Sequence, residues 1–236
     1  MYTIFDEEQR DYVQVEEPDH SLTYTYADYM AWKFKERLEL FRGKIFKMAA
    51  ANMNHQVVGG NLYNQFYNHL KGKTCRVFIA AFDVRLPVKN RKKNVPGMRA
   101  EKISAFPAKA PMSVLSDDTP PAYPDDEITT VVQPDVCIFC DPSKLDDRGA
   151  CGAPDLAIET LSPSNRKDEL RMKYEVYEEA GVKEYWIADP ARKAVLVYLL
   201  QPDGKFSVPE IFSGSDQLAA QCVPGLKFHI NEIFTP

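Results

Sequence analysis

A strand, a turn and a helix follow one another between residues 155 and 180, and this unit constrains the fold more than any other segment. Residues 155–161 are mostly apolar, as in a buried strand. Ser162, Pro163 and Ser164 end that strand, and Ser164 is a suitable N-cap for a helix over residues 165–180. A buried strand followed closely by a helix predicts a mixed α/β fold in which this helix crosses one face of a central sheet.

Lys173 lies near the centre of the apolar face of the predicted helix. With an advance of about 100° per residue, one arc of this helix holds Leu170, Met172, Tyr174, Val176, Tyr177 and Ala180. A fully solvated lysine belongs on the opposite face. We therefore expect its ammonium to reach solvent along its stem, to pair with Glu169 one turn earlier, or to point at an anionic group.

Two carboxylates occupy positions that the pattern predicts to be buried. Asp135 opens an apolar strand, and Glu159 lies inside the strand described above. Buried carboxylates are costly unless they are paired, hydrogen-bonded or bound to a cation. With Lys173 nearby, the two acids could hold a hard divalent cation and orient a water for attack on phosphorus. In the alternative interpretation, Asp135 caps a turn and Glu159 pairs with Arg166 or Lys173.

The composition indicates a folded protein with a substantial core. Apolar residues make up 44% and aromatic residues 11% of the 236 residues, as in a globular domain. No apolar run reaches about 18 residues, and the N-terminus does not resemble a signal peptide. We therefore expect a soluble protein that does not enter a membrane. Five cysteines, an odd number in no regular framework, favour a reducing cytoplasm.

Cys137 and Cys140 have the spacing of half a zinc site. No second such pair and no histidine pair completes it, and the two side chains would face opposite sides of a strand. We therefore do not predict a zinc site.

The order of predicted elements indicates a single domain over residues 1–236, with extra strands towards the C-terminus. Thr25 caps a short helix over residues 26–32, residues 39–48 are strand-like around Gly43, and residues 54–70 form a helix. The remaining strand-like segments are 76–87, 131–139, 155–161, 184–188, 194–200 and 205–212. A turn at residues 202–204 precedes the last of them.

A long segment between residues 88 and 130 differs in composition from its surroundings. It begins with basic residues, then becomes rich in proline, alanine and aspartate, as expected of an inserted loop. Its basic start includes Arg91, Lys92 and Lys93, which could contact phosphates or simply be solvated, and the segment could also mediate oligomerisation. The net charge of −5 argues against a protein whose whole surface binds nucleic acid.

Several motifs resemble the Uma-two family, which is classed with the restriction endonucleases of the PD-(D/E)XK nuclease superfamily. They are Pro134-Asp135, the run from Pro154 to Ser164, and Lys173 with Tyr177 and the run from Gly181 to Pro190. The similarity extends upstream through residues 24–29, 39–43 and His55. It implies a restriction-endonuclease-like fold, in which helices flank a mixed central sheet, and a metal-dependent nuclease activity that is common in bacteria.

The resemblance also implies roles for particular residues. Asp135 matches the aspartate of the Pro-Asp motif, and Glu159 matches the acidic residue of the second motif. Glu39 matches the glutamate of the first helix that often completes the metal site. The superfamily's lysine normally follows the second acid by two residues, where this chain has Leu161. Lys173 therefore resembles a relocated replacement.

Our leading hypothesis is an endonuclease that uses Mg²⁺ or Mn²⁺ to hydrolyse DNA. Asp135 and Glu159 would hold the ion, Glu39 would support it, and Lys173 would act on the attacking water or the phosphate charge. A homodimer is expected if both strands of a duplex are cut. The alternatives are a catalytically silent member that binds nucleic acid or a protein, and a hydrolase of a small phosphorylated substrate.

Overall fold

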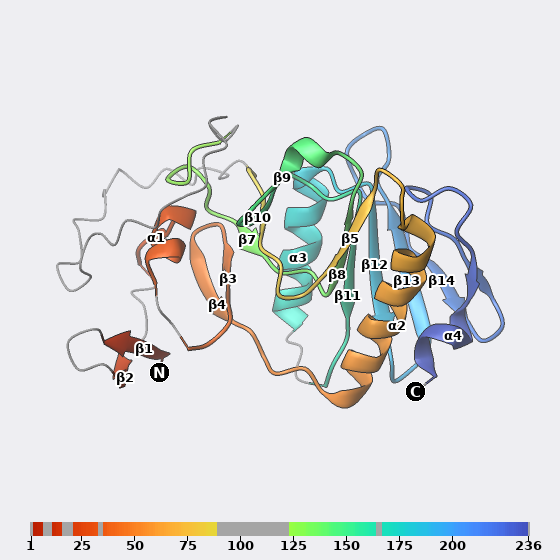
Figure 1. Ribbon diagram of the computed structural model, residues 1–236, viewed down its shortest axis with the longest axis horizontal. Helices are drawn as coiled ribbons and strands as arrows, with labels where there is room; N and C mark the ends of the chain where they lie inside the picture. The colour runs from red at the N-terminus through yellow and green to blue at the C-terminus, as the bar shows by residue number, and fades with distance from the viewer. Residues whose placement is uncertain are drawn as a thin grey trace.

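A six-stranded mixed sheet forms the centre of the molecule (Figure 1). The computed structural model describes residues 2–6, 11–15, 21–32, 35–88, 123–163 and 167–235. The strands lie in the order β14-β13-β12-β11-β8-β5, and β11 and β12 run parallel while the other neighbours are antiparallel. They are β5 (Arg76–Ile79), β8 (Val136–Phe139), β11 (Leu156–Thr160), β12 (Glu184–Asp189), β13 (Ala194–Leu199) and β14 (Glu210–Ser213).

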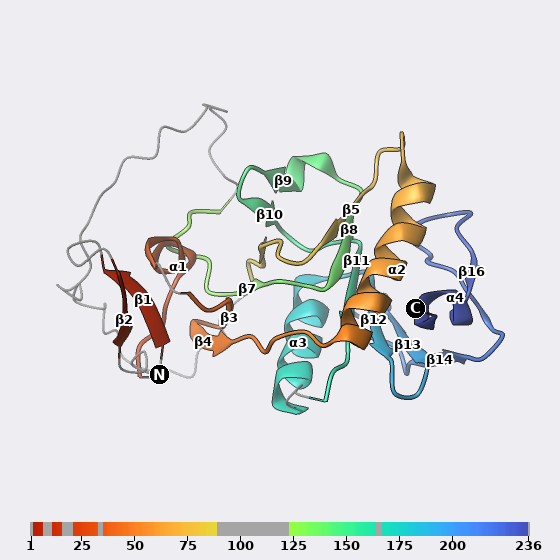
Figure 2. The same cartoon turned by 60° about the horizontal axis from the view of Figure 1, so that its bottom comes forward.

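Helices cover both faces of this sheet, as predicted. The strands β8, β11 and β12 lie between α2 (Met53–Leu70) and α3 (Lys167–Ala180) in both views (Figures 1 and 2). Side chains alternate between the two faces because each strand has a period of two residues. Ile138 and Ile158 pack with α2, whereas Cys137 and Ala157 pack with α3.

A second six-stranded sheet lies beside the first, in the order β4-β3-β7-β6-β10-β9. Its strands are β3 (Leu38–Phe41), β4 (Lys44–Lys47), β6 (Val84–Arg85), β7 (Val131–Val132), β9 (Leu145–Asp146) and β10 (Gly149–Cys151). The hairpin between β3 and β4 turns at Arg42 and Gly43, both with positive φ, as in the two-residue turns that match strand twist. Gly43 also leaves no room for a side chain, since an added Cβ would lie 2.3 Å from Thr23.

The chain passes from one sheet to the other five times between β4 and β11. The crossing between β7 and β8 consists of Gln133, Pro134 and Asp135. Residues on this crossing therefore contact both sheets, and this arrangement brings distant parts of the sequence to one site.

Smaller elements complete the described structure. The N-terminal hairpin of β1 (Tyr2–Asp6) and β2 (Asp11–Val15) and the pair β15 (Gln217–Leu218) and β16 (Phe228–His229) form separate two-stranded sheets. Short helical segments are α1 (Tyr26–Ala31), the 3₁₀ turn η1 (Pro142–Lys144) and α4 (Ile230–Phe234). Among the described residues, no helix is both long and apolar enough to cross a bilayer.

Four predicted segments differ from the structure. The segments 76–87 and 131–139 were each predicted as one strand, but each is divided into two strands that belong to different sheets. The strand predicted over residues 205–212 is confined to β14, and Phe206 forms only an isolated bridge to Leu200. Pro209 lacks the N–H that a strand ladder needs, and Val208 is 91% exposed, so no regular pairing extends across them. The end of the predicted loop over residues 88–130 packs into the core, since Ile128 is buried beside Tyr26 and Leu40.

A disulfide joins Cys75 and Cys140, which flank the paired strands β5 and β8. The odd number of cysteines, typical of a reducing cytoplasm, did not predict this bond. The register explains the contact, because Arg76 pairs with Phe139 and the two cysteines come next along the ladder. Cys137, the other half of the Cys-x-x-Cys motif, is buried and free. The cellular location stays a prediction.

Candidate functional site

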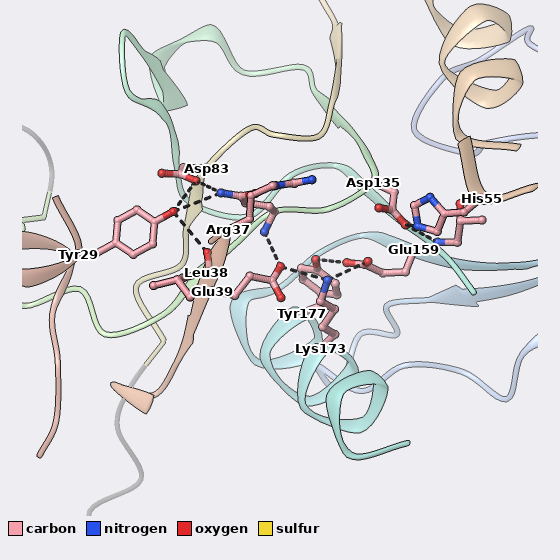
Figure 3. Close-up of polar contacts among 12 residues, drawn as sticks. Tyr29, Arg37, Leu38, Glu39, His55, Asp83, Asp135, Glu159, Lys173 and Tyr177 are labelled. Carbon is pink, nitrogen blue, oxygen red and sulfur yellow. Dashed lines mark hydrogen bonds and ion pairs between the residues drawn. The ribbon is translucent and has the colours of Figure 1, made fainter. Parts of the chain in front are cut away.

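Glu159 and Lys173 form the centre of the site. Glu159 points from β11 towards α3, where Lys173 Nζ donates to its Oε2 at 2.9 Å and the Tyr177 hydroxyl donates to its Oε1 at 2.7 Å (Figure 3). Lys173 and Tyr177 are four residues apart, so they lie on the same face of the helix. Lys173 is 3% exposed and Glu159 is 5% exposed. Of the three roles expected for the ammonium, contact with an anionic group is confirmed, and the partner is not Glu169.

Glu39 brings a second carboxylate to the same ammonium. Its Oε1 lies 3.1 Å from Lys173 Nζ and accepts a hydrogen bond of 2.7 Å from the backbone N–H of Gln133. The resemblance implied a glutamate on the first helix, but Glu39 lies on β3 in the second sheet. A strand position suits the contact, because β3 runs next to β7 and so faces the crossing that begins at Gln133.

Asp135 lies at the start of β8 beside the end of β11. Its Oδ2 accepts a hydrogen bond of 2.7 Å from the backbone N–H of Thr160 and lies 3.0 Å from Nε2 of His55 on α2. Oδ1 takes part in neither contact. The ladder pairs Val136 with Ile158, so its continuation by one step places Asp135 beside Glu159. The two predicted acids are therefore brought together by the neighbouring strands β8 and β11.

Burial and the attraction between Lys173 and the acids dominate the electrostatics of this cluster. Burial raises the pKa of Glu159 to about 8, although Lys173 opposes the shift, and Asp135 and Glu39 raise it further. Burial likewise raises the pKa of Glu39 against the influence of Lys173. Burial alone would lower the pKa of Lys173, but the carboxylates of Glu159 and Glu39 raise it well above its ordinary value. Three acids share one ammonium here, so the cluster favours a further cation.

A cleft of about 90 Å³ opens onto these residues. Asp135, Glu159 and Lys173 line it together with His55 and Arg37. Many of the other lining residues are small, namely Ala49, Ala50, Ala51, Gly59, Gly60 and Ala80.

Gly59 and Gly60 lie inside helix α2 and line the cleft. A Cβ added at either position would meet no atom within 4 Å. Glycine inside a helix is unfavourable by about 1 kcal/mol relative to alanine, and no neighbour in the described structure requires it. The two glycines therefore leave open space beside the acids.

The donor set fits a hard divalent cation, which prefers carboxylate and carbonyl oxygens. Oδ1 of Asp135 is not used in the contacts with Thr160 and His55, and each carboxylate oxygen of Glu159 has lone pairs beyond the one it shares with Lys173 or Tyr177. In the parts of the chain that the structure describes, however, no three histidine, cysteine or acidic side chains are grouped as a preformed metal site. An ion here would need water or substrate oxygens to complete its shell.

Four residues of the site were not predicted as functional from the sequence, namely Arg37, His55, Gln133 and Tyr177. His55 lies on the same face of its helix as Val58, and Tyr177 lies on the same face of its helix as Lys173. This helical period was the available sequence signal for the two residues. Arg37 and Gln133 meet across 96 residues of sequence, and no local pattern could have joined them. The basic residues Arg91, Lys92 and Lys93 lie outside the described residues, and their role in binding DNA stays a prediction.

Known proteins show the same fold. A crystal structure described as "a putative nuclease belonging to DUF820", from Anabaena variabilis ATCC 29413, superposes with a TM-score of 0.61 over 89% of this chain and 97% of that chain, at 16% sequence identity. An "Uncharacterized protein slr1290" from Synechocystis sp. (strain PCC 6803) is 22% identical over 210 residues, which cover 88% of this chain and 89% of that protein.

The family comparison covers most of the sequence. Residues 26–96 and 102–231 match the model of the Uma2 family, which is described as "Putative restriction endonuclease". The match includes Glu39, Asp135, Glu159 and Lys173, so the strands and the helix that carry the acidic cluster are parts of the shared fold. By sequence and by fold, the chain belongs to the Uma2 family of restriction endonuclease-like proteins.

Proposed function

We propose that this protein is a metal-dependent endonuclease that hydrolyses phosphodiester bonds of DNA. The observation that supports this most strongly is the ammonium of Lys173, held between Glu159 and Glu39 at a cleft that also contains Asp135. A fixed cation beside two or three acids can offset the negative charge that a phosphodiester brings and that its transition state concentrates.

Asp135 and Glu159 would hold Mg²⁺ or Mn²⁺. When bound, such an ion activates water and stabilises charge on the phosphate oxygens. Oε1 of Glu39 is already engaged by Lys173 and Gln133. The geometry therefore supports a role for Glu39 in holding the ammonium better than direct ligation of the ion.

The protein groups divide the remaining work. Lys173 stabilises negative charge on the reacting phosphate. Tyr177 fixes the position of Glu159, and Glu39 fixes the position of the Lys173 ammonium. His55 contacts Asp135 and restricts the orientation of that carboxylate. Lys173 would serve as the relocated lysine, and the contact of its ammonium with Glu159 on β11 supports that role.

Cleavage of plasmid DNA in Mg²⁺, in Mn²⁺ and in EDTA tests the proposal. We expect cleavage only with a divalent ion, and we expect Asp135→Asn to abolish it. Asp126→Asn is the matched control, because Asp126 is exposed and does not line the cleft. Cleavage that persists in Asp135→Asn would refute the assignment.

The same assay separates the alternatives. Binding of DNA without cleavage in either metal would favour the catalytically silent member of the family.

We also propose that the active form is a homodimer, since two sites are needed to cut both strands. Light scattering during size-exclusion chromatography, with and without a DNA duplex, measures this directly.

A further inference from the structure

Arg37 occupies a distinctive electrostatic position at the cleft. Five arginines in the described parts of the chain pair with a carboxylate, namely Arg42, Arg85, Arg148, Arg171 and Arg192. Arg37 instead donates from Nε at 3.1 Å and from Nη2 at 2.7 Å to the side-chain oxygen of Gln133. A neutral amide fixes the guanidinium without neutralising its charge.

The amide of Gln133 is itself held in one orientation. Its Nε2 donates to Asp83 Oδ1 at 2.7 Å and to the Tyr29 hydroxyl at 3.2 Å. A flipped amide would place Oε1 against the Asp83 carboxylate and turn its NH₂ group towards Arg37, so both contacts would be repulsive. Gln133 is 6% exposed. The network therefore presents the side-chain oxygen of Gln133 to the guanidinium of Arg37.

Arg37 also lies on the same side of the chain as Glu39, a member of the acidic cluster. It precedes Glu39 by two residues and lies just before β3, where its carbonyl oxygen accepts from the Met48 N–H and continues the pairing with β4, so the two side chains project to the same face. Both are tied to Gln133, Glu39 through the backbone N–H and Arg37 through the side-chain oxygen. One residue on the crossing thus sets the positions of Arg37 and of the carboxylate that holds Lys173.

We propose that Arg37 is a phosphate-binding residue of this site, and that Gln133 and Asp83 are its positioning residues. The inference rests on the proposed nuclease function and names the group that receives the substrate backbone. Nη1 and the outer hydrogen of Nη2 are not used in the contacts with Gln133, and a guanidinium fork matches two oxygens of a phosphodiester. Both residues line the cleft, but Lys173 is buried whereas Arg37 is exposed and therefore accessible to a substrate.

Binding of a fluorescent DNA duplex in Ca²⁺, measured by anisotropy over a series of salt concentrations, tests this role. Arg37→Gln should weaken binding by about tenfold or more and should lower the slope of log affinity against log salt by about one. Arg76→Gln is the matched control, since Arg76 is exposed on β5 and does not line the cleft. It should change neither quantity comparably.

Two further variants separate the charge from its positioning. Arg37→Lys keeps the charge but not the fork, so it should restore the salt slope while cleavage stays reduced. Asp83→Asn removes the constraint on the Gln133 amide, so it should reduce cleavage while the salt slope remains that of the wild type. A purely structural role for Arg37 would leave the salt slope unchanged in every variant.

The possible failures are distinguishable. If the wild-type protein cleaves DNA and Arg37→Gln behaves like Arg76→Gln in binding and in cleavage, the assignment of Arg37 is wrong and the nuclease proposal stands. If the wild-type protein neither binds nor cleaves DNA, both proposals are wrong.

Discussion

Lys173 and Glu159 meet at 2.9 Å although one comes from a helix and the other from a strand of the central sheet. The two residues are 14 positions apart in the sequence, and the contact between them is buried. A charge pair of this kind links the stability of the fold to the chemistry of the site, so its removal should affect both.

Replacement of Lys173 by methionine should destabilise the protein by about 3–5 kcal/mol, because it leaves two buried carboxylates without their cation. Loss of that cation should raise the pKa of Glu159 above its present value of about 8. A glutamate with a raised pKa favours the folded state only while it is protonated, so the destabilisation should be larger at pH 9 than at pH 5. Denaturant unfolding at both pH values measures this.

Cleavage per folded molecule by Lys173→Met should fall by about a hundredfold or more. The double variant Lys173→Met, Glu159→Gln is the control for stability, since it removes one of the stranded charges and should recover part of the loss. A single variant that is equally destabilised at both pH values would contradict the electrostatic explanation.

Binding of Mn²⁺ should release a proton near pH 7. Glu159 has a pKa of about 8 in the metal-free protein, so it is mostly protonated there, whereas a metal ligand must be a carboxylate. Affinity should therefore rise as the pH increases towards 8. Calorimetry in buffers with different ionisation enthalpies counts the released protons, and Glu159→Gln should bind weakly without release. A binding heat that does not depend on the buffer would exclude Glu159 as the titrating ligand.

His55 should contribute to metal affinity through Asp135. His55→Ala removes the contact at 3.0 Å and should weaken Mn²⁺ binding by about 10-fold or more. His69→Ala on the same helix is the control, because His69 contacts Pro224 and does not line the cleft. The Mn²⁺ concentration that gives half-maximal cleavage provides the measurement, and equal values for the two variants would remove His55 from the site.

The paired substitution Gly59→Ala, Gly60→Ala should stabilise the protein and reduce cleavage. Each alanine favours the helix by up to about 1 kcal/mol, and neither methyl group meets an atom within 4 Å. The same methyl groups would occupy space beside the acids, where we expect the substrate backbone. Thermal unfolding and plasmid cleavage are the two measurements. A variant that is more stable and fully active would show that the glycines serve no purpose in substrate access.

Local sequence patterns predicted the parts of the site that one strand and one helix supply. The apolar strand around Glu159 and the helical period around Lys173 placed both side chains correctly, because strand alternation and helical period are properties of short segments. Asp135 was found for the same reason, at the entrance to an apolar strand.

The rest of the site depends on contacts between distant segments. Glu39 reaches Lys173, and Arg37 reaches Gln133, only because the second sheet lies beside the first. Several strands of that sheet have two or three residues, too few to show a period. The hydrogen bonds and burial that fix those strands come from their neighbours, so their own sequences carry little signal.

The bond between Cys75 and Cys140 closes a covalent ring around the segment that contains β6, the basic residues Arg91 to Lys93, β7 and Asp135. A protease that cuts this segment once would therefore produce two fragments that stay linked, and they would separate on a denaturing gel only after reduction. The half that carries Lys173 would also keep its connection to the half that carries Glu39, so a nicked molecule would retain every member of the acidic cluster.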